Sequence, residues 1–306
     1  MKKHASIVYV ILIFLLGSVG LYWIADNGLK IASFDKEKKT NVPFESSLLA
    51  KEGESIDQYN RGKILAEIQV PPDNKRAVKW YALAAKKGYT DAQNDLGVMY
   101  EKGRGVKQNY KTALKWYSLA AKQGEPVSQH NLAVMYENGQ GIKQSYKSAI
   151  KWYTLAAKQG YVDSQNNLGV IFEKGLGVAQ NYLTAVKWYT LAAEKGDATA
   201  QFNLGGMYDE GRGVPKDDKT AMNWYTLAAE QGKVMAQFNL GVMYGKGEGV
   251  LKNNVYAHLW LNFAASSGDK DAIKNRDLLA ERMSSSDITT AKILNRECIL
   301  KSYKGC

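Results

Sequence analysis

Few side chains in this sequence could carry out catalysis or hold a metal ion. The chain has 306 residues and three histidines, His4, His130 and His258, which are far apart in sequence. Its two cysteines, Cys298 and Cys306, both lie near the carboxyl terminus. A metal centre or a catalytic dyad needs several such groups close together. We therefore expect no metal site, no cofactor and no thiol nucleophile in the body of the protein.

One short motif has the spacing of a nucleophilic site. Ser148 and Lys151 form Ser-x-x-Lys, the pattern in which penicillin-recognising enzymes hold their serine nucleophile. Neither Ser-Asp-Asn nor Lys-Thr-Gly, which complete such a site, occurs in the chain. The positions 36 residues earlier hold Thr112 and Lys115, so the motif belongs to a recurring column of the sequence. We therefore expect that the protein is not an enzyme and has no small-molecule substrate.

The sequence contains an internal repeat, which predicts the secondary structure on which these residues lie. Tryptophan recurs every 36 residues, at Trp80, Trp116, Trp152, Trp188, Trp224 and Trp260. Leucine, tyrosine and glycine columns recur in the same register through five complete units, which occupy 92–271. Such a period is typical of solenoids, in which each unit packs against its neighbours.

Each unit has the pattern of two amphipathic helices. In the first unit, Ala92, Leu96 and Tyr100 are four residues apart, and a second apolar stripe surrounds Trp116. A Gly-x-Gly sequence lies between the stripes, and glycine suits the positive φ that ends a helix. Asn109 is a favoured N-cap residue for the second helix. No glycine pair continues as Gly-Lys-Ser or Gly-Lys-Thr, so we interpret the pairs as turns inside a helix hairpin and not as phosphate-binding loops.

The complete pattern resembles a known repeat family. The units follow A-x-x-N-L-G-x-M-Y-x-x-G-x-G-V and then K-x-A-x-x-W-Y-x-x-A-A-x-x-G, which is similar to the Sel1-like repeat, a relative of the tetratricopeptide repeat. The resemblance implies an all-α fold, an α/α solenoid that winds as a right-handed superhelix. It also implies a degenerate first repeat at 56–91, in which Pro71 and Pro72 replace the glycine loop, and a C-terminal helical cap at 272–306.

The tryptophan column has two possible interpretations. Aromatic faces can stack on sugars or bases, which would make the column a binding surface. The position of the tryptophans beside alanine and leucine favours a hydrophobic core between repeats. We therefore interpret all six tryptophans as structural core residues.

A second column is the candidate partner-binding site. It consists of Asn131, Asn167, Asn203 and Asn239, with Asp95 at the equivalent position of the first unit. Asparagine is a poor residue for the middle of a helix, and its amide both donates and accepts hydrogen bonds. The resemblance implies that these asparagines clamp the backbone of a bound peptide, as in tetratricopeptide relatives. The alternative is that they bridge neighbouring helices through side-chain hydrogen bonds.

Basic residues form a further column, at Lys79, Lys115, Lys151 and Lys187, which we interpret as a solvated face. This column is the next candidate surface for a partner. The chain has 41 Lys and Arg residues against 30 Asp and Glu residues, and its formal net charge is +11. Because the basic residues are spread along the chain, we expect no nucleic acid partner.

The amino terminus has the composition of a membrane segment. Lys2 and Lys3 precede an uncharged run at 5–25, which is about as long as the hydrocarbon core of a bilayer is thick. We interpret 1–25 as a signal-anchor, and the alternative is a signal peptide cleaved after Gly20. The polar residues 26–55 are predicted to form a linker between this segment and the repeats.

Together these features predict a non-enzymatic scaffold that binds a partner protein or peptide on its solenoid surface. We expect a protein anchored in a bacterial inner membrane, with its body in the periplasm. Cleavage would instead give a secreted, host-directed binding protein, and a cell-wall-related hydrolase is the remaining alternative. In an oxidising compartment, Cys298 and Cys306 could form a disulfide if their α-carbons lie within about 7 Å of each other.

Overall fold

The computed structural model describes residues 9–11, 22–25, 28–30, 44–68 and 71–306. The chain forms two compact units, Met1–Ala50 and Lys51–Cys306. The described strands of the first unit are β1 (Tyr9–Ile11), β2 (Tyr22–Ala25) and β3 (Gly28–Lys30). They form an antiparallel sheet in the order β1-β2-β3, in which Val10 lies opposite Trp23.

The predicted membrane segment, 5–25, falls mainly on residues outside those that the structure describes. Its described parts, β1 and β2, are extended, whereas an anchor would be helical. In the part of the chain that the structure describes, no helix has the length and apolar character needed to cross a bilayer. The membrane segment therefore stays a prediction.

The first helix begins earlier than we predicted. Residues 26–55 were expected to form a polar linker, but α1 (Phe44–Lys63) covers the last part of that segment and is followed by a short π-helix, η1 (Ile64–Ile68). Leu48, Leu49 and Ala50 are good helix formers, so the segment favours a helix although it lacks an amphipathic period.

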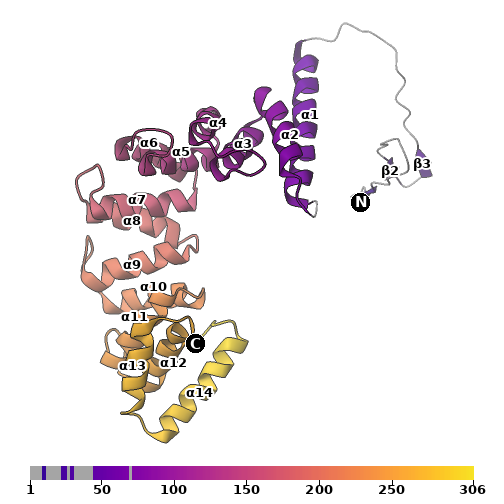
Figure 1. Ribbon diagram of the computed structural model, residues 1–306. Helices are drawn as coiled ribbons and strands as arrows, with labels where there is room; N and C mark the ends of the chain where they lie inside the picture. The colour runs from indigo at the N-terminus through magenta and orange to yellow at the C-terminus, as the bar shows by residue number, and fades with distance from the viewer. Residues whose placement is uncertain (1–8, 12–21, 26–27, 31–43, 69–70) are drawn as a thin grey trace, which may run out of the picture. The chain divides into compact units, whose positions relative to one another are not determined.

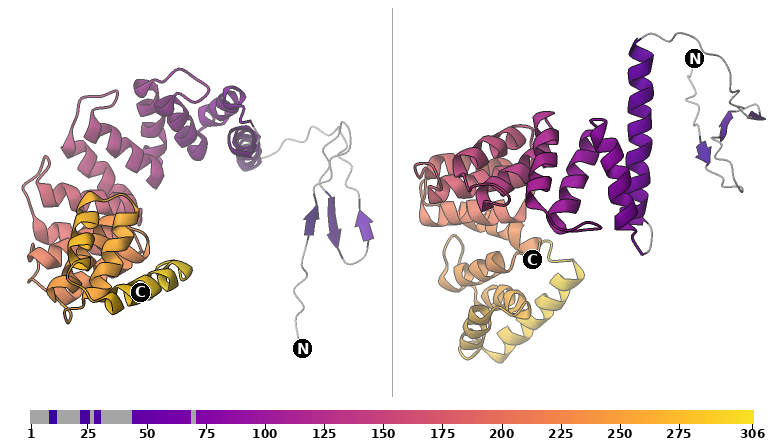
Figure 2. Two further views of the ribbon diagram at one scale, coloured as in Figure 1. Left: turned by 60° about the horizontal axis from the view of Figure 1, so that its bottom comes forward. Right: turned by 45° about the horizontal axis from the view of Figure 1, so that its top comes forward.

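The second unit is a stack of paired helices, so the all-α prediction is correct for this unit. The helices after α1 are α2 (Asn74–Lys86), α3 (Thr90–Lys102), α4 (Tyr110–Lys122), α5 (Pro126–Asn138), α6 (Tyr146–Lys158), α7 (Val162–Lys174), α8 (Tyr182–Ala193), α9 (Ala198–Glu210), α10 (Asp218–Glu230), α11 (Val234–Lys246), α12 (Asn254–Ser266), α13 (Lys270–Ala280) and α14 (Ser285–Leu300). Each helix from α3 to α12 packs against the helices before and after it in the chain (Figures 1 and 2). We call α3, α5, α7, α9 and α11 the odd helices, and α2, α4, α6, α8, α10 and α12 the even helices. The handedness of the superhelix stays a prediction.

The expected turn signals occur at the helix ends. Asn109 caps α4, because its side-chain oxygen accepts a hydrogen bond from the backbone N–H of Thr112 at 3.0 Å. Gly103 ends α3 in the left-handed conformation, with φ 67°. Gly105, the second glycine of the pair, has a different role: a Cβ at this position would collide with the carbonyl oxygen of Asn74 in α2. The glycine pair therefore both ends the odd helix and lets the loop approach the preceding even helix.

Tyrosines, and not most of the tryptophans, fill the core. Each tyrosine that directly follows a tryptophan of the column is 0–2% exposed: Tyr81, Tyr117, Tyr153, Tyr189 and Tyr225. The tryptophans before them, Trp80, Trp116, Trp152, Trp188 and Trp224, are only partly buried. Trp260 is 1% exposed and lies within the core, as predicted, whereas the other five are only partly buried. Four of them pack against the edge of the core: Trp116, Trp152, Trp188 and Trp224.

The helix geometry explains this difference. Consecutive residues of an α-helix point about 100° apart, so only one member of a Trp-Tyr pair can point directly at the partner helix. The tyrosine takes that direction, and the tryptophan lies at the edge of the core. Trp116, for example, packs against buried residues of α2, in the preceding repeat, and of α3, in its own repeat. The tryptophans therefore contribute to the seam between repeats without forming its centre.

Glycine in the odd helix makes room for the tyrosine ring. A Cβ on Gly97 would lie 2.5 Å from the Tyr117 ring, and a Cβ on Gly205 would lie 2.7 Å from the Tyr225 ring. Gly62 in α1 stands in the same relation to Tyr81, where a Cβ would be 2.6 Å from the ring. Because α1 has this glycine, it acts as the first helix of the first repeat.

The C-terminal cap closes the stack and confirms the predicted disulfide. Cys298 and Cys306 are bonded, and their α-carbons are 5.7 Å apart. The residues between them fold back over α12, so that the ring of Tyr303 lies edge-on to Phe263 with centroids 4.9 Å apart. The backbone N–H of Gly305 donates a hydrogen bond to Glu230 of α10 at 2.8 Å. The disulfide thus holds the end of the chain against the last two even helices.

The core assignment can be tested with two substitutions in one helix. Tyr153→Ala should lower the free energy of unfolding by about 3 to 5 kcal/mol, because it leaves a cavity under a fully buried ring. Trp152→Ala in the same helix should cost clearly less, because its side chain is only partly buried. Urea unfolding followed by circular dichroism measures both. Equal losses, or a larger loss for Trp152→Ala, would contradict the assignment.

Candidate functional site

A row of tyrosine–carboxylate pairs joins each of the four even helices α4, α6, α8 and α10 to the odd helix before it. The hydroxyl oxygen lies 2.6 Å from the carboxylate in Tyr117–Glu101, 2.6 Å in Tyr153–Glu137, 2.5 Å in Tyr189–Glu173 and 3.3 Å in Tyr225–Asp209. Burial raises the pKa of all four tyrosines, and the neighbouring carboxylates raise it further. The hydroxyls therefore stay protonated and donate to the carboxylates.

The last repeat has lost both members of this pair. Leu261 stands where the tyrosine would be, and Gly245 stands where the acid would be. Leu261 still packs against Gly241, whose Cβ would lie 2.6 Å from its side chain. A Cβ on Gly245 would meet nothing closer than Ala257 at 3.7 Å. The missing side chains leave open space beside α11.

Two hollows lie beside α11. The polar hollow has a volume of about 490 Å³ and is lined by α9, α11 and the loops after them, including Asp209, Glu210, Lys216, Phe238, Asn239, Lys246 and Glu248. The apolar hollow has a volume of about 320 Å³ and is lined by residues of α11, α12 and α13 and by Arg282, including Val242, Gly245, Leu261, Leu278 and Leu279. Because Val242 and Lys246 line both hollows, they adjoin. We call the two together the groove.

Charges are distributed unevenly along the groove. Lys246, Arg282 and Asn275 surround the apolar hollow. Lys246 forms an ion pair with Glu248 at 3.4 Å, whereas the Arg282 guanidinium makes no ion pair with any residue that the structure describes. The polar hollow contributes the carboxylates of Asp209 and Glu210 in addition to Glu248. The groove therefore combines two environments. The apolar hollow lies beside the Arg282 guanidinium, and the polar hollow carries the carboxylates.

The comparison with known proteins follows the same repeats. The model of the Sel1 repeat matches six segments, at 58–89, 90–125, 126–161, 162–197, 198–233 and 234–269. The chain belongs to the Sel1 repeat family. The segment 58–89 is thus a sixth Sel1 repeat, where we predicted a degenerate repeat at 56–91.

Solved structures with the same architecture include two bacterial proteins. A Sel1 repeat protein from Oxalobacter formigenes is 33% identical and has a TM-score of 0.63, over 74% of this chain and 86% of that one. The c5321 protein, a protective antigen present in uropathogenic Escherichia coli strains, is 28% identical and has a TM-score of 0.53, over 84% of this chain and 64% of that one. A search among curated proteins found no match.

Three of the four asparagines of the predicted column use their side chains to contact a neighbouring helix. The side-chain amide of Asn131 donates to the Asn94 oxygen of the preceding odd helix at 3.1 Å, and Asn203 donates to Asn166 at the same distance. These are the bonds that the bridging alternative predicts. Asn167 instead donates to the Tyr153 hydroxyl at 3.1 Å.

Asn239 differs from the other members of the column. Its side chain acts to lower the pKa of Tyr225, against the effect of burial, and it also lines the polar hollow. Peptide binding by the column as a whole stays a prediction, and the structure places Asn239 where such binding has most space.

Sequence reasoning missed a buried glutamine column. Gln93, Gln129, Gln165, Gln201 and Gln237 are 3–4% exposed, and each side-chain amide donates to an alanine carbonyl of the preceding even helix. In three repeats a second glutamine at the end of the even helix donates to the first, as Gln123 does to Gln93 at 2.7 Å. Lys195 occupies that position in 162–197, and the side-chain oxygen of Gln165 has no partner. A polar residue recurring every 36 positions is the signal that could have revealed this column.

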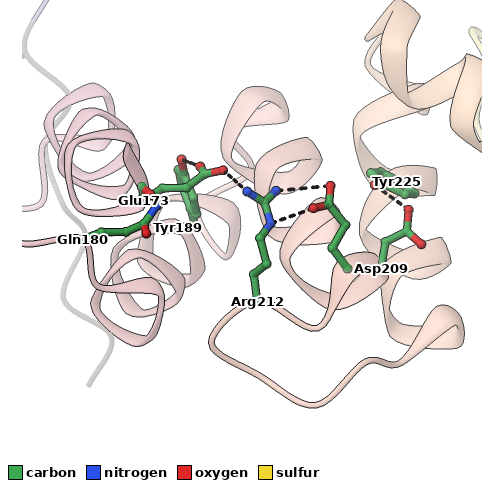
Figure 3. A network of polar contacts seen from close by, with 7 residues as sticks. Glu173, Gln180, Tyr189, Asp209, Arg212 and Tyr225 are labelled. Carbon is green, nitrogen blue, oxygen red and sulfur yellow. Dashed lines mark hydrogen bonds and ion pairs between the residues drawn. The ribbon is translucent and has the colours of Figure 1, made fainter. Parts of the chain in front are cut away.

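An arginine links two repeats near the groove (Figure 3). The Arg212 guanidinium, in the loop after α9, lies 2.7 Å from Glu173 of α7 and 2.9 Å from Glu210. It also lies over the Tyr182 ring, 5.7 Å from its centroid. Because Glu173 accepts from Tyr189 as well, a chain of polar contacts runs between the repeats 162–197 and 198–233.

The histidine and serine considered as catalytic candidates make contacts within the fold. His130 contacts the Ser164 hydroxyl at 2.9 Å, and burial lowers its pKa. Ser148 lies in the first turn of α6, where its backbone N–H is bound by the capping Ser145. Among the residues that the structure describes, no group of His, Cys, Asp or Glu side chains could hold a metal ion.

The tyrosine–carboxylate pairs predict how stability depends on pH. Because the pKa of each buried tyrosine is raised on folding, the unfolded chain releases protons above pH 10.0 while the folded chain retains them. The free energy of unfolding should therefore fall as pH rises above this value, by up to about 1.4 kcal/mol per pH unit for each tyrosine. Tyr153→Phe keeps the ring but removes one titrating group, so its decline should be shallower.

Urea unfolding at several values between about pH 8 and pH 11 measures both slopes. Tyr110→Phe, at a partly buried ring whose hydroxyl has no carboxylate partner, is the matched control. Parallel pH curves for Tyr153→Phe and the unaltered protein would contradict the prediction.

Proposed function

We propose that this Sel1 repeat protein is a non-enzymatic scaffold that holds a peptide segment of a partner protein in the groove. The observation that carries the proposal is the groove, whose apolar hollow lies where Gly245 and Leu261 stand in place of the carboxylate and the tyrosine. In the first four of the five repeats in 92–271, a tyrosine and a carboxylate fill this space and form a hydrogen bond. In the last of them the space is open.

The lining of the groove indicates the chemistry of the peptide. An apolar side chain fits the apolar hollow, where it would contact Val242, Leu261 and Leu278. A carboxylate next to that side chain would pair with Arg282 and Lys246. A basic residue farther along the peptide would meet the carboxylates of the polar hollow, where the Asn239 amide is available to the peptide backbone.

We also propose that the repeats act outside the cytoplasm. The disulfide between Cys298 and Cys306 supports this location, because such bonds persist in oxidising compartments. The apolar run at 5–25 supports a signal-anchor that would leave the repeats on the periplasmic side of an inner membrane.

The groove can be filled without disturbing the fold. Gly245→Glu restores the acid of the other repeats, has space for its Cβ, and brings a negative charge close to Lys246 and Arg282. Peptides selected on the full chain from a random library should bind this variant at least tenfold more weakly, which corresponds to about 1.4 kcal/mol. Its melting temperature should be unchanged or slightly higher, because glycine disfavours a helix interior.

Gly53→Glu is the matched control, because it makes the same change in α1 at a position with nothing within 4 Å of the new Cβ. Fluorescence anisotropy with the selected peptides measures the affinities of both variants. If the peptides bind Gly245→Glu as tightly as the unaltered protein, the groove is not the binding site.

A further inference from the structure

A second surface lies on the first three even helices. Each of these helices exposes the same four residues, at positions i, i+4, i+8 and i+11: Lys75, Lys79, Leu83 and Lys86 on α2; Lys111, Lys115, Leu119 and Lys122 on α4; Lys147, Lys151, Leu155 and Lys158 on α6. This spacing puts all four on one side of a helix. We call the surface that they form the lysine face.

The charges of the lysine face are not neutralised by the protein. None of the nine lysines forms an ion pair with any residue that the structure describes, and α2, α4 and α6 contain no acidic residue. Lys115 lies over the Trp116 ring at 5.9 Å, and Lys151 lies over the Trp152 ring at 5.7 Å. The partly buried tryptophans therefore support the lysine side chains without removing their charge.

The lysine face has a limit within the stack. On α8 and its C-cap the four positions hold Leu183, Lys187, Leu191 and Glu194, and on α10 they hold Lys219, Asn223, Leu227 and Glu230. The leucine column continues unchanged, at 37–44% exposed from Leu83 to Leu227, while the charge does not. The positive charge is thus confined to one part of a regular surface.

We propose that the lysine face docks on an anionic lipid bilayer. A bilayer surface is laterally uniform, and an array in which three adjacent helices repeat the same residues matches it without any unique contact. Lysines can lay their stems along the leucines and direct their ammonium groups to the lipid phosphates. An acidic protein would be recognised by features that distinguish one helix from the next, and the three helices carry identical residues at the four positions of the lysine face.

The lysine face and the groove use different helices. The groove lies on α9, α11, α12 and α13, whereas the lysine face lies on α2, α4 and α6. Docking on lipid would therefore leave the groove open to a peptide. The proposal is independent of peptide binding, and a failure of one leaves the other untouched.

The test compares two kinds of vesicle with the full chain. One kind is phosphatidylcholine alone, and in the other about one third of the lipid is phosphatidylglycerol. Insertion of the amino-terminal segment would contribute to binding of both kinds of vesicle. The affinity for the anionic vesicles divided by the affinity for the phosphatidylcholine vesicles therefore reports on the lysine face. This ratio should be at least tenfold at low salt and should fall as salt is added.

The variant Lys79→Glu, Lys115→Glu and Lys151→Glu should bring the ratio close to one. Its matched control, Lys102→Glu, Lys143→Glu and Lys174→Glu, makes the same change in net charge at exposed positions outside the lysine face and should keep most of the ratio. Circular dichroism melts of both variants establish that they are folded. Mass spectrometry after lysine acetylation should show the nine lysines protected by the anionic vesicles.

Three results would overturn the proposal. The first is an equal loss of the ratio in both variants, which would show a general effect of net charge. The second is a ratio near one for the unaltered chain. The third is release of the protein from anionic vesicles by a soluble polyglutamate or a short DNA duplex at matched charge concentration, which would assign the face to another polyanion.

Discussion

The close contact between a tyrosine ring and a helix glycine determines how these repeats pack. Gly97 and its counterparts let the ring lie directly on the odd helix, and this distance in turn brings the hydroxyl to a carboxylate one turn farther along, as in Tyr117 and Glu101. One repeat holds Ala133 in place of the glycine, so a single methyl group can be accommodated beside Tyr153. A larger side chain would separate the two helices and break both contacts.

One candidate binding surface lies where this regular pattern is interrupted. The other lies on the exposed side of helices that follow the repeat. At Gly245 and Leu261 the internal pair is absent, and the space becomes a groove. On α2, α4 and α6 the tyrosine is buried, and the side of each helix that is not needed for packing carries lysine. The core thus uses the positions common to all repeats, and the differences between repeats are available for function.

Much of the second unit could be predicted because its signals are local. The period of the tryptophans aligned the repeats, Asn109 marked a helix start, and the two cysteines were close enough in sequence to pair. The burial of Tyr153 over Trp152 could not be predicted in this way, since both are aromatic and both neighbour the same alanines. The choice depends on which residue points at the next helix, and that direction comes from tertiary packing.

The candidate site was harder to predict for a related reason. The asparagine column was noticed because asparagine is unusual inside a helix, yet Asn131 and Asn203 use their amides between helices. The groove arises from side chains that are missing, and an absent side chain is visible in a sequence only as an interruption in an aligned column. The helical start of α1 at Phe44 was missed because the sequence there has no amphipathic period.

The unpaired oxygen of Gln165 has a consequence for how the stack responds to its surroundings. In three other repeats a partly buried amide pair ties the end of an even helix to its odd partner, and salt has little effect on such a neutral bond. In 162–197 this tie is absent, and one of the contacts that join the same repeat to the next is the ion pair of Arg212 and Glu173, which remains partly accessible to water. Dissolved ions weaken accessible ion pairs. The contact between 162–197 and 198–233 is therefore more sensitive to dissolved ions than the neutral amide pairs of the other repeats are.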